Sequence, residues 1–217
     1  MELNEIATLM AMTLGVSWAS GINLYAAILA LGLAGSMGYA ELPEQLAIIE
    51  SPWVIVAAAV MYCVEFCADK IPGVDTGWDA IHTFIRLPAG ALLASGMVSD
   101  MGMAAELAAA IVGGSVAAGT HATKAGSRAL INTSPEPFSN WTASVTEDVA
   151  VFAGVWAMLN HPWWFLLCLL LFILLMIWLL PKIWRGIRMI WRKIRGKSDE
   201  PDIEPEPQPD IDTAETS

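Results

Sequence analysis

The sequence places its ionisable residues at the ends of long apolar runs, and two groups of them have helical spacing. Glu65 and Asp69 lie one helical turn apart. His121, Lys124 and Arg128 follow one another at i, i+3 and i+7, so each group occupies a single helix face. Carboxylates and bases of this kind can form ion pairs, exchange protons, or hold an anion such as phosphate. The two groups are therefore the first candidates for a functional site.

Glu65 lies about one turn inside its apolar run, where an ionised carboxylate is costly. We expect it to face the interior of a helical bundle and to meet Lys124 or Arg128, or else to take up a proton. His121 could titrate near neutral pH, although a single histidine near a helix end is often an ordinary hydrogen-bonded residue.

A polar stretch, "NTSPEPFSNWTASVTED", follows the three bases and adds further candidates. Its polar groups include Asn132, Glu136 and Asn140. Ser144, with Glu147 three residues later, matches a capping box, which predicts that a helix begins there. We therefore interpret Ser144 as a structural cap.

A pattern of small residues occurs twice, as "GVSWASGINLYAA" at 15–27 and "GGSVAAGTHATKA" at 113–125. The polar groups that follow it are Asn23 and Tyr25 in the first copy and His121, Thr123 and Lys124 in the second. Glycine-interrupted helices mark binding sites in transporters with inverted repeats, whereas small residues also serve close helix packing. We expect the two stretches to cross near Gly21 and Gly119.

Transmembrane helices must position these residues. The chain has 217 residues, of which 56% are hydrophobic and only 15% charged, a composition typical of a polytopic membrane protein. Apolar runs near the length of about 20 residues that crosses a bilayer lie at 6–32, 52–69, 82–99, 103–125, 146–160 and 163–180. The run at 82–99 is the weakest because it contains His82, Arg86 and Pro88. Since an open strand edge cannot face lipid, we predict an all-α membrane bundle of about six spans.

The basic residues predict the orientation of these spans. Six spans that start inside place all eleven lysines and arginines on the cytoplasmic side, and leave only acids in the loops 33–51 and 100–102. We therefore predict a multi-pass protein of a bacterial inner membrane with both termini cytoplasmic. The repeated stretches lie three spans apart, so they predict a 3+3 inverted repeat, with repeats at about 6–99 and 103–181.

Two segments follow the predicted membrane domain, residues 1–181. The segment 182–197 alternates basic residues with Trp and Ile at helical spacing, which predicts a juxtamembrane helix that binds anionic lipid headgroups and needs no nucleic-acid partner. Residues 198–217 carry eight of the 22 acidic residues and almost nothing to bury, so we expect a disordered acidic tail.

The blocks "GINLYA", "ADKIPGVD", "SPEP" and "ED" resemble the bacterial membrane family catalogued as domain of unknown function number 4126. The resemblance covers about residues 8 to 160, with the last span and the tail beyond it. It implies an integral membrane protein and gives no activity. The functional residues it implies are Gly21, Asn23, Glu65, Asp69, Lys70, Asp75, Asp79, His121, Lys124, Arg128, Asn132, Glu136, Asn140 and Asp148.

Three functions fit these features. The first is a small transporter or channel for an unknown small solute, with a polar site open to the cytoplasm. The others are a non-catalytic membrane scaffold and an intramembrane enzyme that acts on a lipid phosphate. No P-loop, nucleophile elbow or zinc motif is visible in the sequence, so we favour a role without catalysis, cofactor or metal. The sequence leaves a homo-oligomer open.

Overall fold

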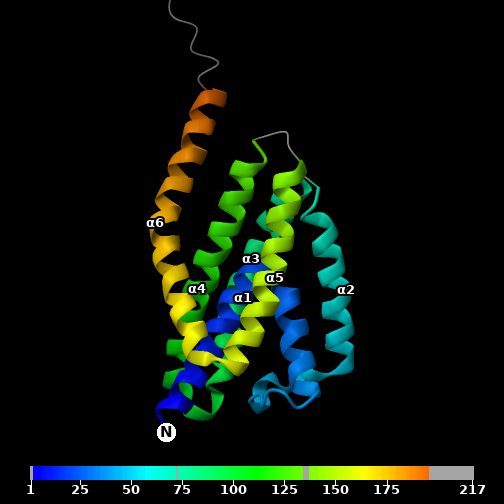
Figure 1. Cartoon of the computed structure of the whole chain (residues 1–217), viewed down its shortest axis with the longest axis vertical. Helices are drawn as coiled ribbons and strands as arrows, with labels where there is room; N and C mark the ends of the chain where they lie inside the picture. The colour runs from blue at the N-terminus through cyan, green and yellow to red at the C-terminus, as the bar shows by residue number, and fades with distance from the viewer. Residues whose placement is uncertain (1, 72, 134–136, 196–217) are drawn as a thin grey trace, which may run out of the picture.

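The chain is helical throughout the part that the structure describes. The computed structural model describes residues 2–71, 73–133 and 137–195 (Figure 1). Its helices are α1 (Leu3–Ser36), α2 (Pro52–Ala68), α3 (Val74–Met97), α4 (Met103–Ile131), α5 (Pro137–Asn160) and α6 (Pro162–Arg195), with 3-10 helices η1 (Glu44–Glu50) and η2 (Ser99–Met101) before α2 and α4. The predicted all-α class is confirmed, whereas the tail 198–217 lies outside the described residues.

Several of these helices are apolar enough for a membrane. By length and composition, α1, α4, α5 and α6 could each cross a bilayer, and η1 with α2, bent by 63° at their junction, could form a fifth span. α3 does not pass this test, and its sequence contains Asp75, Asp79, His82 and Arg86 among its apolar residues. Within the described residues the count is therefore four or five, and six spans are not found.

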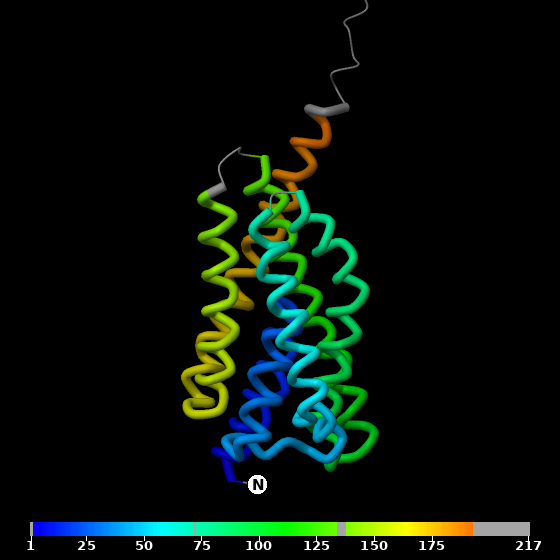
Figure 2. The backbone as a smooth tube through the Cα atoms, turned by 90° about the vertical axis from the view of Figure 1, so that its right-hand side faces the viewer, coloured from blue at the N-terminus to red at the C-terminus, as the bar shows by residue number. Residues whose placement is uncertain are grey.

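α1 consists of two helices joined at Asn23. This residue has extended backbone angles, φ −147° and ψ 101°, within an otherwise helical run. Its side-chain Oδ1 accepts a hydrogen bond from the backbone N–H of Ala26 at 3.0 Å, the geometry of an N-cap for the helix that follows. The chain reverses there (Figures 1 and 2): residues 3–22 enter from the end where the N-terminus lies, and residues 24–36 return to that end.

The first half of α1 packs along α4 in the same direction. Gly113 faces Ser17, and one turn further along both helices Gly21 faces Ala117, whose carbonyl oxygen would lie 2.6 Å from an added Cβ. The two similar stretches therefore form one close interface, for which both helices need small residues. The prediction that they run in opposite directions is wrong, and the 3+3 inverted repeat that was inferred from it is not confirmed.

The second half of α1 runs antiparallel to α2. Gly32 packs on Ile55 near the start of α2, whereas Ala27 clusters with Tyr62 further along it. The predicted span 6–32 is therefore a hairpin that enters and leaves by one end, while α2 to α6 run from end to end (Figure 2). As a result, the N-terminus and the end of α6 lie at opposite ends of the bundle (Figure 1), whereas the predicted topology places both on the cytoplasmic side.

Two helices begin earlier than their apolar runs predict. α3 begins at Val74 and α5 at Pro137, about two turns before the predicted starts at 82 and 146. A proline at the first helical position is a common helix start. Ser144 consequently lies inside α5, where it is buried, and the predicted cap at this residue is wrong.

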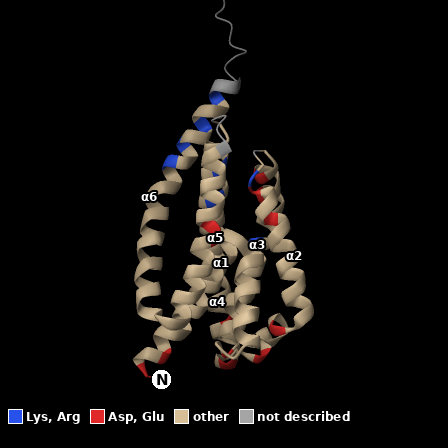
Figure 3. Ribbon diagram, turned by 45° about the vertical axis from the view of Figure 1, so that its right-hand side comes forward, with Lys and Arg blue, Asp and Glu red and all other residues tan. Residues whose placement is uncertain are grey.

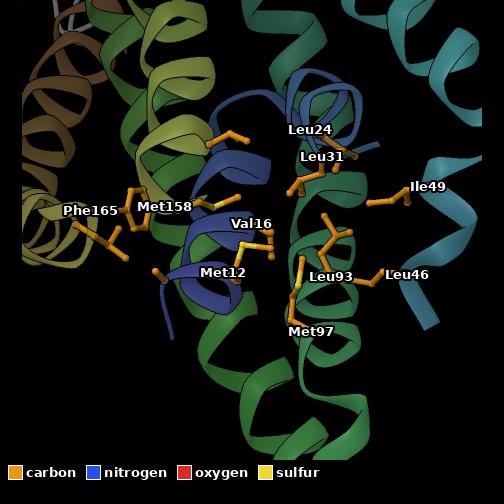
Figure 4. Packing of buried hydrophobic residues seen from close by; sticks show 13 residues of the cluster. Met12, Val16, Leu24, Leu31, Leu46, Ile49, Leu93, Met97, Met158 and Phe165 are labelled. Atoms are coloured by element: carbon orange, nitrogen blue, oxygen red, sulfur yellow. The ribbon is translucent and has the colours of Figure 1, made fainter. Parts of the chain in front are cut away.

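The bundle divides into an apolar end and a charged end. Near the N-terminus, Met12, Leu31, Met97, Met158 and Phe165 bring both halves of α1 together with α3, α5 and α6 in one hydrophobic cluster (Figure 4). Lysine and arginine gather toward the other end, where α6 finishes. The charged residues at the end with the N-terminus are acidic (Figure 3). The break in α1 lies between these two regions.

Candidate functional site

Arg86 on α3 is the centre of a buried charge cluster. Its Nη2 pairs with Glu65 Oε1 on α2, and its Nη1 lies 3.2 Å from Asp79 Oδ1, two turns earlier on α3. The side chains of Arg86 and Glu65 are both 0% exposed, and that of Asp79 is 2% exposed. Buried charges are tolerated when they are paired and hydrogen-bonded, so this arginine supports both carboxylates.

Lys124 on α4 joins three parts of the bundle. Its Nζ lies 2.8 Å from Asp69 Oδ2 and 3.4 Å from Glu65 Oε1, and it donates to the backbone oxygen of Ile22 at 3.1 Å. The predicted contact of Glu65 with Lys124 is confirmed, and the ammonium group also reaches the break in α1.

Arg128 lies one turn beyond Lys124 and holds Glu147 on α5 in a bidentate pair. Its Nη2 and Nε lie 2.7 and 3.2 Å from the two carboxylate oxygens. Its Nη1 donates to the backbone oxygen of Asp69 and to Asn140 Oδ1, each at 3.0 Å. Pairs of this kind are among the strongest hydrogen bonds in proteins. The Glu147 side chain is 21% exposed and is the most accessible carboxylate of the cluster.

Asp75 forms a separate polar clamp at the start of α3. Its carboxylate accepts hydrogen bonds from the backbone N–H groups of Gly73 and Thr76. Asn132 donates to both of its oxygens at 2.8 Å, and Asn140 donates to Oδ2 at 3.2 Å. Since both oxygens of Asp75 are satisfied, this cluster fastens α3, α4 and α5 together and is a structural feature.

The break in α1 presents two helix ends to the charge cluster. At the end of the first half, the carbonyl of Ile22 accepts from the ammonium of Lys124. At the start of the second half, Asn23 Nδ2 donates to Asp148 Oδ1 on α5 at 3.1 Å. A cation at a helix C-terminus and a carboxylate at a helix N-terminus each complement the helix dipole. The reversal is thus matched by one charge of each sign.

His121 is hydrogen-bonded on both ring nitrogens. Arg86 Nη1 lies 3.2 Å from Nδ1, and Thr83 Oγ1 lies 2.7 Å from Nε2. A guanidinium can only donate, so Nδ1 accepts and the remaining proton resides on Nε2. Thr83 in turn donates to the backbone oxygen of Asp79. The ring is therefore neutral in this arrangement and acts as a link between α3 and α4.

Negative charge exceeds positive charge in this region. Ion pairs within 4.0 Å join three cations to four carboxylates, which are Arg86, Lys124 and Arg128 with Glu65, Asp69, Asp79 and Glu147. Several carboxylates also have one buried oxygen without a hydrogen-bond partner among the described residues, namely Glu65 Oε2, Asp69 Oδ1, Asp79 Oδ2 and Asp148 Oδ2. Among the described residues, Arg86 Nε is a buried donor without a partner as well. The hydrogen-bonding positions left open in the site are therefore four carboxylate oxygens and one guanidinium N–H.

Lys70 lies just beyond α2, beside the cluster. Its Nζ is 2.8 Å from the centroid of the Phe66 ring and donates to the Phe66 backbone oxygen at 3.1 Å. Burial lowers the pKa of this amine from its ordinary value, with nearby Asp148 and Asp69 acting in the opposite direction. The amine therefore lies at the edge of the site, held against Phe66.

Most residues proposed from the sequence meet at one place. Gly21, Asn23, Glu65, Asp69, His121, Lys124, Arg128 and Asp148 surround the α1 break, and Asn132 lies in the Asp75 clamp. Gly119 does not join them, because it packs on Met176 of α6, where an added Cβ would lie 2.7 Å from the sulfur atom. Glu136 lies outside the described residues.

Two residues of the cluster were missed or misread. Arg86 was treated only as a defect in a weak span, and Glu147 as part of a cap. In both cases a charge within or beside an apolar run was the available signal, since such a charge requires a buried partner.

The sequence matches the family described as Domain of unknown function (DUF4126) over residues 10–182. The chain belongs to the DUF4126 family. The DUF4126 match includes all of the cluster residues and most of the apolar part of α6, so the last span is not outside the family region as the sequence resemblance implied. No curated protein and no solved structure matches the chain significantly.

Proposed function

We propose that this DUF4126 protein is a small membrane transporter or channel whose site is the buried charge cluster at the tip of the α1 hairpin. The observation that carries the proposal is the reversal at Asn23, because it brings the carbonyl of Ile22 and the amide of Asn23 to Lys124 and Asp148. Broken helices whose freed ends face ionisable groups are a recurrent way to bind solutes and ions inside a bilayer.

The state of the cations speaks against an enzyme that acts on a lipid phosphate. Such an enzyme needs Lys124, Arg128 or His121 to hold the phosphate. Here both cations pair with carboxylates, and His121 is engaged on both nitrogens. A scaffold would gain nothing from so many buried charges, each of which is costly in a membrane.

The charge distribution supports an orientation. Because the described lysines and arginines lie toward the end where α6 finishes (Figure 3), the positive-inside rule places that end in the cytoplasm. The N-terminus and the open end of the hairpin then lie on the outer side, and the tip of the hairpin points toward the cytoplasm. The basic part of α6, from Lys182 onward, would contact anionic headgroups of a bacterial inner membrane.

A flux assay tests the proposal. Purified full-length protein in vesicles should pass at least one class of small solute from a panel of cations, anions and neutral molecules. Glu65→Gln and His121→Ala should abolish this flux while the protein stays folded, and Asp100→Asn, an exposed acid far from the cluster, should not. Vesicles with protein that are no more permeable than empty vesicles to every solute would overturn the proposal.

A further inference from the structure

Asp148 differs from the other buried carboxylates of the described chain. It is 7% exposed, yet no Lys, Arg or His nitrogen lies within 4.0 Å of it, whereas Glu65, Asp69 and Asp79 each have such a partner. Asp75 also lacks an ion pair, but both of its oxygens accept hydrogen bonds. Asp148 has one such bond, from Asn23 to Oδ1, and its buried Oδ2 has no partner among the described residues.

The single partner of Asp148 controls the α1 hairpin. Asn23 uses its Nδ2 to donate to Asp148 and its Oδ1 to accept from Ala26, so one amide group holds the carboxylate and caps the second half of α1. A change in the charge of Asp148 changes the strength of a charge-assisted hydrogen bond and also its interaction with the helix dipole. The hairpin is therefore directly coupled to the charge state of this residue.

Other ionisable groups lie close enough to influence Asp148 from the surrounding elements. They are Tyr62 on α2, Asp69 and Lys70 just after α2, and Lys124 on α4. Two of these groups are cations, but each has nearer partners: Lys124 pairs with Asp69, and Lys70 lies over the Phe66 ring. Asp148 thus experiences both signs of charge without a dedicated counter-ion.

The oxygen atoms available at Asp148 fit a proton better than a metal ion. Small metal ions need several oxygen or nitrogen ligands at once, and among the described residues no trio of His, Cys, Asp or Glu is placed to hold one. A proton needs only the free oxygen of a single carboxylate. The exchange balances simply: a hydronium ion gives its proton to Asp148 Oδ2 and leaves a water molecule, and the carboxylate becomes a neutral acid that can donate.

We propose that Asp148 is the proton-binding site of this protein and that the ion moved through the site is the proton. The inference rests on the proposed transport function. The ionised carboxylate holds Asn23 and the hairpin tip in the arrangement seen here. Protonation weakens that bond and gives Oδ2 a hydrogen to donate, so Asp148 no longer holds Asn23 and the hairpin tip as firmly.

Infrared difference spectroscopy on the full-length protein in lipid tests the binding site itself. We expect a protonated carboxylic acid C=O band that appears as the pH is lowered and is absent in Asp148→Asn. Asp100→Asn, which makes the same acid-to-amide change at an exposed residue away from the cluster, should retain the band. If Asp148→Asn does not fold, Asp148→Glu should shift the band without removing it. A titrating band that is unaffected by these changes at Asp148 would overturn the proposal.

Proton uptake into vesicles that carry an imposed pH gradient and an internal pH dye tests the transported ion. We expect uptake in the native protein and a fall to the level of empty vesicles in Asp148→Asn. Flux of another solute that ignores both the gradient and Asp148→Asn would refute the proton assignment and leave the transport proposal standing. An infrared band that depends on Asp148, without any flux, would support the proton site and overturn transport.

Discussion

Replacing Arg86 by methionine should destabilise the protein far more than the loss of any surface charge. The guanidinium pairs with Glu65 and Asp79, and all three side chains are 0 to 2% exposed. Its removal leaves two buried carboxylates without their main cation, and breaking a buried pair in this way costs about 3 to 5 kcal/mol. For a chain of this length, at about 2 to 4 °C per kcal/mol, the melting temperature should fall by about 6 to 20 °C.

The matched variants separate charge from packing. Arg185→Met removes an exposed arginine of α6 and should change stability by no more than about 0.5 kcal/mol. Adding Glu65→Gln and Asp79→Asn to Arg86→Met removes the stranded charges and should recover about 0.5 to 3 kcal/mol, the usual coupling of groups in contact. Thermal unfolding in detergent measures all of them. If Arg86→Met melts within a degree of Arg185→Met, or the added changes recover nothing, the interpretation of this cluster as a tightly paired network is incorrect.

Three further expectations concern the hairpin and its surroundings. Gly21→Ala should lower the free energy of unfolding by about 1 to 3 kcal/mol, because its methyl would lie 2.6 Å from the Ala117 oxygen. Gly77→Ala, with no atom within 4 Å of the added Cβ, should be neutral or up to about 1 kcal/mol more stable. Melting curves of both variants decide this. Asn23→Ala should lose about 0.5 to 2 kcal/mol and Asn23→Ser less, since a serine oxygen can still cap Ala26; equal losses in denaturation curves would contradict the capping role. In a chain without Cys63, Cys67 and Cys168, Glu2→Cys and Glu44→Cys should react with an impermeant maleimide from one side of a vesicle and Arg185→Cys from the other, and labelling of all three from the same side would exclude the fold.

The outline of the helices could be predicted from apolar runs alone, because α2, α4 and α6 begin where such runs begin. The starts of α3 and α5 could not. Both helices open with polar turns whose residues are satisfied by partners far away in sequence, as Asp75 is by Asn132 and Asn140. Hydropathy contains no information about such partners, so it places the helix start at the first apolar residue.

The reversal of α1 was the largest error of sequence reasoning. Residues 6–32 form one long apolar run, and the local signal for a break is an asparagine that can cap a helix. Whether Asn23 interrupts the helix depends on Lys124 and Asp148, which accommodate the two freed ends from more than a hundred residues away. The membership of the site was easier to predict, because each buried charge requires a partner wherever the helices run.

The hairpin also constrains the order in which the protein can be assembled. Its contacts join residues separated by 102 positions at Ile22 and Lys124, by 125 at Asn23 and Asp148, and by 159 at Asn4 and Trp163. α1 is synthesised before α4, α5 and α6, so it must wait for them before it can dock, and contacts so distant in sequence form slowly. Until then the apolar residues of α1 lie outside their final site, so we expect α1 to be the last element to dock. Newly made chains should be most exposed to degradation before α1 has docked.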